Sequence, residues 1–402
     1  MLFKAFASVA VVATTLLTGA SAQYNAAYKN MTAVYWGQNA VYAADQSKPL
    51  QYDLLTTCNN TNVDIVIISF VTKFIGKSGY PVINLSNQCG TVFPNATNPK
   101  VDTDILSCPQ IGTMITQCQK LGKKILLSLG GATLSTQAFK DAPTAQGGAN
   151  ALWAMFGPPG SNPFTYRPFA NATIDGYDFD FEHTANKPFL DTFAKQLRAK
   201  FDTNKSRQYL LTAAPQCPLP DATLDTALTT ISFDAVFIQF YNNACGANKW
   251  KAGQAQTSNS VFNLQMWQTW ATTKSLNKNV KLFVGFIAGG LPGTTGYVAK
   301  ATAQQIVAES QKLANFGGAS FWDSSVCNGN SAYLPGVRST LVSYVTKRDV
   351  ETVSVEARQI KSPVGGAATY TAEEFVEAKV PADAFNRFKR RHAHHRRSRF
   401  LG

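Results

Sequence analysis

One stretch of the chain alternates acidic residues with large aromatic ones at a spacing of two. Residues 175–182 read DGYDFDFE. Successive side chains of a β-strand point to opposite faces, so as a strand this stretch places Asp178, Asp180 and Glu182 on one face. Neighbouring carboxylates repel one another and lose hydration on burial, so folding alone gives no reason to keep three of them together. The pattern therefore predicts a chemical role for this strand.

The three carboxyl groups suit general acid–base catalysis. Close like charges drive their pKa values apart, so one group keeps its proton and serves as an acid. We expect Glu182, the outermost, to reach a substrate oxygen, Asp180 to stay ionised beside it, and Asp178 to lie deepest. A site for a hard metal ion is one alternative, and a buried ion-pair network is another. No Lys or Arg stands at the neighbouring strand ends, which favours glycosidase-type acid chemistry.

Eight short apolar runs recur along the chain, at residues 32–37, 63–70, 124–131, 174–183, 209–214, 235–241, 281–286 and 318–322. Runs this rich in Val, Ile, Leu and Phe indicate strands buried on both faces, as in a parallel sheet. Helix-like stretches lie between them, at residues 111–121, 188–201, 261–275 and 302–314. The alternation predicts an α/β fold, a (β/α)8 TIM barrel. A doubly wound open sheet is the alternative, but the first run lacks the glycine-rich phosphate turn of that class.

Several of these runs end in polar or aromatic residues. They are Gln38, Ser69, Gly130, Glu182, Gln239, Tyr241 and Trp322. In a barrel the C-terminal strand ends converge on one face, where active sites lie, so the sequence predicts that these side chains surround one cleft.

The N-terminus indicates export. Residues 1–22 have the features of a signal peptide: Lys4 precedes a mostly apolar run, and Ala20-Ser21-Ala22 forms a cleavage site. A membrane anchor is the alternative, but the run is short and rich in small polar residues. We expect a secreted protein, extracellular or in a cell wall. N-x-S/T sequons fit the same route, at Asn30, Asn59, Asn84, Asn95, Asn171 and Asn204.

The formal net charge of the 402 residues is +13, and part of it lies in a separate C-terminal block. Residues 384–402 hold seven Lys or Arg and no acidic residue. We expect residues 23–348 to form the catalytic barrel and residues 349–402 a polar, then basic tail that is largely disordered. The tail could bind an anionic cell-wall or membrane surface, be merely solvated, or be removed after Lys347-Arg348. No phosphate-binding loop, cofactor motif or nucleic-acid motif is present, and we expect a monomer without metal or cofactor.

The acidic stretch matches the D-G-x-D-x-D-x-E signature of glycoside hydrolase family 18. The chain most closely resembles the plant and fungal class III chitinases of that family, over roughly residues 29–345. The resemblance extends to YWGQN (residues 35–39), INL (83–85), LSLGG (127–131), TAAPQCP (212–218) and QFYNN (239–243). Together these motifs are far more specific than any one of them.

This resemblance implies an endochitinase that cleaves chitin or chitooligosaccharides with retention, using the substrate's own acetamido group. Glu182 would protonate the glycosidic oxygen, and Asp180 would hold the acetamido group while sharing a proton with Asp178. Tyr241 would donate a hydrogen bond to the acetamido carbonyl. Trp322 would form the floor under the sugar. The remaining cleft residues would be Tyr35, Gln38, Phe70 and Gln239.

The seven cysteines fit an oxidising compartment, and no C-x-x-C motif suggests zinc. By the resemblance the disulfides would be Cys58–Cys118, Cys89–Cys108 and Cys217–Cys245, with Cys327 free. Residues 40–45 and 323–327 depart from the plant pattern beside the cleft, which leaves the number of sugar subsites open. His183 is expected to have a structural or capping role.

Two other functions stay open. An endo-β-N-acetylglucosaminidase that cleaves the core of N-glycans shares the acidic signature. A non-hydrolytic chitin-binding lectin shares the family, but such members usually lack the acid that Glu182 supplies here.

Overall fold

The computed structural model describes residues 29–343, apart from residues 96–97, 99–101 and 162. The predicted signal peptide and the C-terminal tail lie outside the described residues. Within the described part, no helix has both the length and the apolar character needed to cross a membrane.

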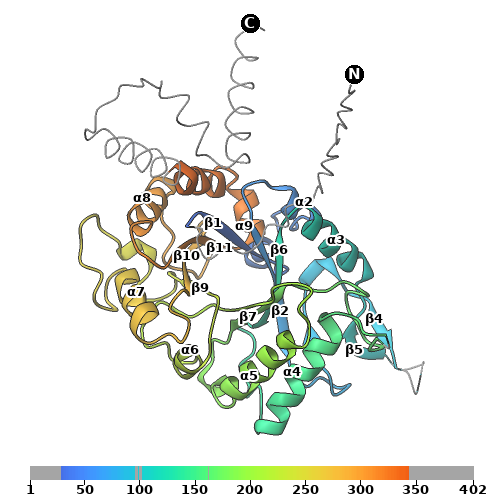
Figure 1. The fold of residues 1–402 in the computed structure, drawn as a ribbon. Coiled ribbons are helices and arrows are strands. Elements are labelled where there is room, and N and C mark those ends of the chain that lie inside the picture. The colour runs from blue at the N-terminus through green and yellow to red at the C-terminus, as the bar shows by residue number, and fades with distance from the viewer. Residues whose placement is uncertain (1–28, 96–97, 99–101, 162, 344–402) are drawn as a thin grey trace, which may run out of the picture. The chain divides into compact units, whose positions relative to one another are not determined.

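Within these residues, parallel strands close into a barrel (Figure 1). The barrel strands are β1 (Met31–Trp36), β2 (Ile65–Lys73), β6 (Lys124–Gly130), β7 (Gly176–Asp180), β8 (Leu210–Ala213), β9 (Ala235–Gln239), β10 (Lys281–Ile287) and β11 (Phe316–Trp322). Strand β1 pairs in parallel with both β2 and β11, which closes the ring. The predicted (β/α)8 barrel is confirmed, and each of its strands overlaps one of the predicted apolar runs.

Helices surround the barrel (Figure 1). They are α2 (Leu54–Asn59), α3 (Pro109–Lys120), α4 (Ala142–Phe156), α5 (Leu190–Asp202), α6 (Asp225–Thr230), α7 (Leu264–Thr273) and α8 (Lys300–Ser310). The four predicted helices correspond to α3, α5, α7 and α8. The sequence pattern missed α4, because Gly147 and Gly148 weaken its helix propensity. Asp141 compensates at the start of α4, where its side chain accepts a hydrogen bond from the Thr144 N–H at 2.8 Å.

Shorter helices and strands lie in the loops that follow the C-terminal ends of the barrel strands. Strand β3 (Val82–Ile83) pairs antiparallel with β2, and β4 (Val92–Pro94) pairs with β5 (Asp102–Leu106). The remaining short elements are α1 (Ala40–Ala44), α9 (Ser324–Gly329), η1 (Ser86–Gln88), η2 (Thr184–Asn186) and η3 (Ala247–Lys249). Residues 333–343 are helical and follow α9.

The strand side chains divide between two apolar cores. One core fills the interior of the barrel and includes Tyr35, Ile67, Leu126, Phe237 and Phe283, all of them buried. The larger core lies between the strands and the surrounding helices. Because both faces of the strands are buried, a polar side chain on an inward face needs partners within the barrel.

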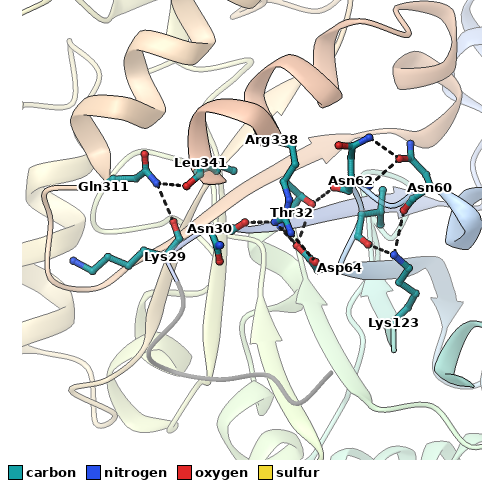
Figure 2. A network of polar contacts seen from close by, with 11 residues as sticks. Lys29, Asn30, Thr32, Asn60, Asn62, Asp64, Lys123, Gln311, Arg338 and Leu341 are labelled. Atoms are coloured by element: carbon teal, nitrogen blue, oxygen red, sulfur yellow. Dashed lines mark hydrogen bonds and ion pairs between the residues drawn. The ribbon is translucent and has the colours of Figure 1, made fainter. Parts of the chain in front are cut away.

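A polar network joins β1 and β2 to the last helical segment (Figure 2). The Arg338 guanidinium forms an ion pair with the Asp64 carboxylate, at 2.6 and 3.1 Å, and also donates to the Asn30 carbonyl. Asp64 in turn accepts a hydrogen bond from the Thr32 N–H at 2.8 Å. Lys123 donates to the Asn60 carbonyl at 3.1 Å. These contacts lie at the N-terminal ends of β1 and β2, whereas Asp180 lies at the C-terminal end of β7.

The structure contains the disulfides Cys58–Cys118, Cys89–Cys108 and Cys217–Cys245. Cys327 is buried and unpaired among the described cysteines. All three pairings and the unpaired cysteine agree with the expectation from the family resemblance.

Candidate active site

The acidic stretch forms β7 and the loop after it. Strand β7 ends at Asp180, so Glu182 lies two residues beyond the strand instead of within it. The side chains become more exposed along the stretch: Asp178 is 0% exposed, Asp180 is 3% exposed, and Glu182 is half-buried. This gradient matches the predicted order of depth from the interior to the mouth of the barrel.

Asp178 is held by hydroxyl groups from three other strands. Its carboxylate accepts hydrogen bonds from Tyr35 Oη on β1 at 3.1 Å, Ser128 Oγ on β6 at 2.9 Å and Thr212 Oγ1 on β8 at 2.7 Å. Burial raises the pKa of Asp178 to about 6, and these three bonds to the carboxylate oppose that rise. The predicted sharing of a proton between Asp178 and Asp180 stays a prediction.

Asp180 and Glu182 are joined through one amide. Gln239 Nε2, at the end of β9, lies 2.8 Å from Asp180 Oδ1, 3.3 Å from Glu182 Oε1 and 3.0 Å from the Ala214 carbonyl. Burial is the main cause that raises the pKa of Asp180 well above its usual value, and the charges of Glu182 and Asp178 add to it. Burial also raises the pKa of Glu182, against the hydrogen bond from Gln239. The pair therefore retains a proton where isolated carboxyl groups would have lost it. The expectation that Asp180 simply stays ionised is not supported, because burial and two neighbouring charges disfavour its charged form.

Tyr241 lies beside the acids, just beyond the end of β9. It is 9% exposed, and burial together with the charges of Asp180 and Glu182 raises the pKa of its hydroxyl well above the usual value. A tyrosine that keeps its proton so firmly remains a hydrogen-bond donor across the working pH range.

Three aromatic rings lie together near the acids, where the family resemblance implies the floor of the site. Trp322, at the end of β11, is half-buried and stacks on Phe70, with ring centroids 5.8 Å apart and an interplanar angle of 18°. Its ring centroid lies 5.7 Å from that of Tyr35. Tyr35 and Phe70 are 4% and 5% exposed, so Trp322 offers the most accessible aromatic surface of the three.

Gln38 supports the wall of the site. Its Nε2 donates hydrogen bonds to the Ser69 carbonyl at 2.8 Å and the Asn84 carbonyl at 3.0 Å. These bonds hold the backbone next to Phe70. Contact between Gln38 and a sugar stays a prediction. His183 Nε2 lies 2.7 Å from the Ala132 carbonyl, which fits the expected structural role.

Sequence reasoning missed several residues that surround the acids. Ser128 and Thr212 pair with Asp178 in the register of β6, β7 and β8. In the sequence, each of them is a hydroxyl residue within an otherwise apolar run, and the two runs form the strands that flank the acidic strand. Asp221 is 4% exposed, and its negative charge contributes to the raised pKa of Glu182. It lies in the loop after β8, where no periodic pattern distinguishes it.

A barrel with paired carboxyl groups and a cluster of aromatic rings at the C-terminal ends of its strands is typical of glycosidases. Residues 31–374 match the model of glycosyl hydrolases family 18, and the chain belongs to this family.

Curated relatives and solved structures resemble the chain over most of its length. A class III chitinase from Arthroderma benhamiae is 39% identical over 80% of this chain and 88% of that protein. Endochitinase 33 from Trichoderma harzianum is 37% identical over 81% of this chain and 96% of that protein. A solved structure of the xylanase and α-amylase inhibitor protein from Scadoxus multiflorus is 28% identical, with a TM-score of 0.58, and covers 76% of this chain and 97% of that one. The fold alone therefore does not determine function, and the site has to decide.

Proposed function

We propose that this protein is an endo-acting chitinase that hydrolyses the β-1,4 bonds between N-acetylglucosamine units. The observation that carries the proposal is the pair Asp180 and Glu182, bridged by Gln239, beside the floor of Trp322. The pair provides an acid with a raised pKa, and the indole provides a flat apolar surface for a sugar ring. The relatives named chitinases support this choice of substrate.

In the proposed reaction, Glu182 donates its proton to the glycosidic oxygen as the bond from that oxygen to the anomeric carbon breaks. The carbonyl oxygen of the substrate's acetamido group forms a new bond to the same carbon from the opposite face. Asp180 accepts a hydrogen bond from the acetamido N–H, and Tyr241 donates one to its carbonyl oxygen. Asp178, held by three hydroxyls, raises the pKa of Asp180 through its charge and shares a proton with it.

In the second step, a water molecule attacks the anomeric carbon and transfers a proton to the Glu182 carboxylate. The bond to the acetamido oxygen breaks, and the product keeps the original configuration after two inversions. In this scheme the substrate supplies the nucleophile, so the protein needs no second carboxylate at the opposite face of the sugar.

Replacement of Glu182 by glutamine tests the proposal. Glu182→Gln keeps the shape and the bond to Gln239 but removes the transferable proton, so we expect hydrolysis of chitin oligomers to be abolished while oligomer binding persists. Glu309→Gln is a matched control, because Glu309 is bonded to Gln256 on the outside of the barrel. Near wild-type hydrolysis by Glu182→Gln would remove Glu182 from its role.

A time course of products separates chitinase from the two other functions. Wild-type protein should release short N-acetylglucosamine oligomers from longer ones and leave a high-mannose glycoprotein intact. Release of the glycan would instead indicate an endo-β-N-acetylglucosaminidase. Binding without any product would indicate a lectin.

Secretion and the fate of the C-terminal segment are also proposals from the sequence. Mass spectrometry of protein recovered outside expressing cells should show an N-terminus at Gln23, as the cleavage motif predicts. A C-terminus at Gly402 in that protein would rule out processing after Lys347-Arg348.

A further inference from the structure

Two short helices meet beside the aromatic floor. Helix α1 follows β1, and α9 follows β11; the two strands are neighbours in the barrel. The helices therefore emerge side by side on the catalytic face and contact each other. They contain most of the two segments, residues 40–45 and 323–327, in which the sequence departs from the plant pattern.

The start of α1 is capped by side chains that belong to the other segment. Asn39, which precedes α1, makes no cap with its own side chain. Instead, the Asp323 carboxylate accepts the Ala40 N–H at 3.1 Å, and Ser325 Oγ accepts the Val41 N–H at 3.2 Å. These are the N–H groups that a helix cannot satisfy for itself.

The same carboxylate also caps α9. Asp323 Oδ1 accepts hydrogen bonds from Ser325 Oγ at 2.5 Å and from the Val326 N–H at 3.1 Å. Asp323 is 1% exposed and Ser325 is 6% exposed, so water cannot replace these bonds. One buried carboxylate thus joins the beginnings of two helices, and its removal would leave buried donors without acceptors.

Both helices connect directly to the floor. Asp323 follows Trp322 in the chain, and the Trp322 ring stacks on Phe70 at 5.8 Å. Helix α1 begins two residues after Gln38, whose amide holds the Ser69 carbonyl next to Phe70. The contacts therefore form a closed circuit, from Trp322 through Asp323 to α1, through Gln38 to Phe70, and back to Trp322.

We propose that Asp323 is a positioning residue for the sugar-binding floor, because it fixes the Trp322 ring through its bonds to α1 and α9. This inference rests on the proposed function, in which Trp322 carries the sugar ring. Asp323 is 1% exposed and is not assigned a contact with the substrate.

The first test compares two helix-capping aspartates. Asp323→Ala removes the carboxylate that joins α1 and α9, and Asp141→Ala removes the cap of α4, which has no part in the floor. We expect both variants to lose thermal stability, but only Asp323→Ala to raise the KM for chitin oligomers and to lower kcat/KM by about tenfold. Asp323→Asn, which keeps one acceptor oxygen, should recover part of that loss. Equal kinetics in the two alanine variants would overturn the proposal.

The second test asks whether Asp323 acts through Trp322. In a Trp322→Ala background the floor is already absent, so Asp323→Ala should have little further effect on kcat/KM. Additive effects of the two substitutions would show that Asp323 acts elsewhere and would contradict the proposal.

A third measurement does not depend on the substrate. The fluorescence of Trp322, taken as the difference between proteins with and without Trp322→Phe, should be quenched more readily by acrylamide when Asp323 is replaced by alanine. Unchanged quenching would overturn the positioning role. Failure of wild-type protein to cleave or bind chitin oligomers would instead refute the proposed function, and the quenching result would still decide the role of Asp323.

Discussion

Gln239 offers the sharpest test of how the two acids are coupled. It is 9% exposed, and its single amide nitrogen contacts both Asp180 and Glu182. Gln239→Met keeps the length and much of the volume of the side chain but removes the donor. We therefore expect the variant to fold and to lose activity because its carboxyl groups are less well placed and less well stabilised when charged.

The size of the loss follows from the bonds that are removed. A hydrogen bond to a charged group contributes about 1.5–3 kcal/mol. The 2.8 Å bond to Asp180 is the better of the two, and the 3.3 Å bond to Glu182 is weaker. A loss of about 2 kcal/mol in transition-state stabilisation corresponds to a fall of roughly 30-fold in kcat/KM.

The pH dependence of kcat/KM provides an independent test, because the removal of Gln239 should shift the profile in a defined direction. The bond from Gln239 lowers the pKa of Glu182 because it stabilises the carboxylate. Removal of this bond should raise the pKa of Glu182, so Glu182 would keep its proton to higher pH. The alkaline limb of the kcat/KM profile should therefore move to higher pH. Asp180 loses a similar bond, so the acidic limb should move in the same direction.

The assay is kcat/KM on a chromogenic chitin oligomer, measured across the acidic and neutral range for wild type, Gln239→Met and a control. Gln268→Met is a suitable control, because Gln268 bonds to Asn315 on the outer side of the barrel. A pH profile of Gln239→Met that superimposes on wild type, with a loss no larger than in the control, would refute this account of the site.

Two further predictions concern stability. Burial raises the pKa of Asp178 to about 6 in the folded protein. The folded state is therefore favoured by the neutral carboxyl group. That stabilisation is complete below the unfolded pKa and is lost as the pH rises through the folded value of about 6. Asp178→Asn should reduce the decline in unfolding free energy between about pH 4 and pH 7 by up to about 3 kcal/mol in urea titrations, whereas equal slopes would contradict the effect. Replacement of Cys217 and Cys245 by alanine opens a loop spanning 28 residues. Chain entropy predicts a loss of roughly 3–4 kcal/mol. A melting temperature equal to that of wild type would contradict this prediction.

The barrel was predictable because its strands are buried on both faces and so appear as continuous apolar runs. The acidic strand was predictable because three carboxyl groups in alternation have no structural justification. The sequence pattern extended this strand too far toward the C-terminus, because β7 ends at Asp180 and Glu182 lies beyond it. Periodic patterns continue through such a boundary, because a residue in an extended loop can share the orientation of the strand before it.

Other parts of the site depend on contacts between distant residues, which a single sequence does not encode in any local pattern. The bond from the Ala40 N–H to Asp323 spans 283 positions, and neither residue signals the other. The same holds for Asp221, which accepts backbone N–H bonds from Gln216 and Leu224 and so organises the loop after β8. Such contacts arise only once the barrel has brought the strand ends together.

The closure of the barrel has a consequence for the order in which the chain folds during synthesis. Strand β1 can pair with β2 early, but its other edge stays open until β11 is made, and the Asp64–Arg338 ion pair spans 274 positions. Because ribosomes add about 5–20 residues per second, the interval between synthesis of β2 and of β11 lasts on the order of tens of seconds.

Meanwhile the disulfides Cys58–Cys118 and Cys89–Cys108 span only 60 and 19 positions, so both can form while the edge is open. We therefore expect the first part of the barrel to be cross-linked before the ring closes. A ribosome that stalls between β2 and β11 would expose a template for strand addition and aggregation.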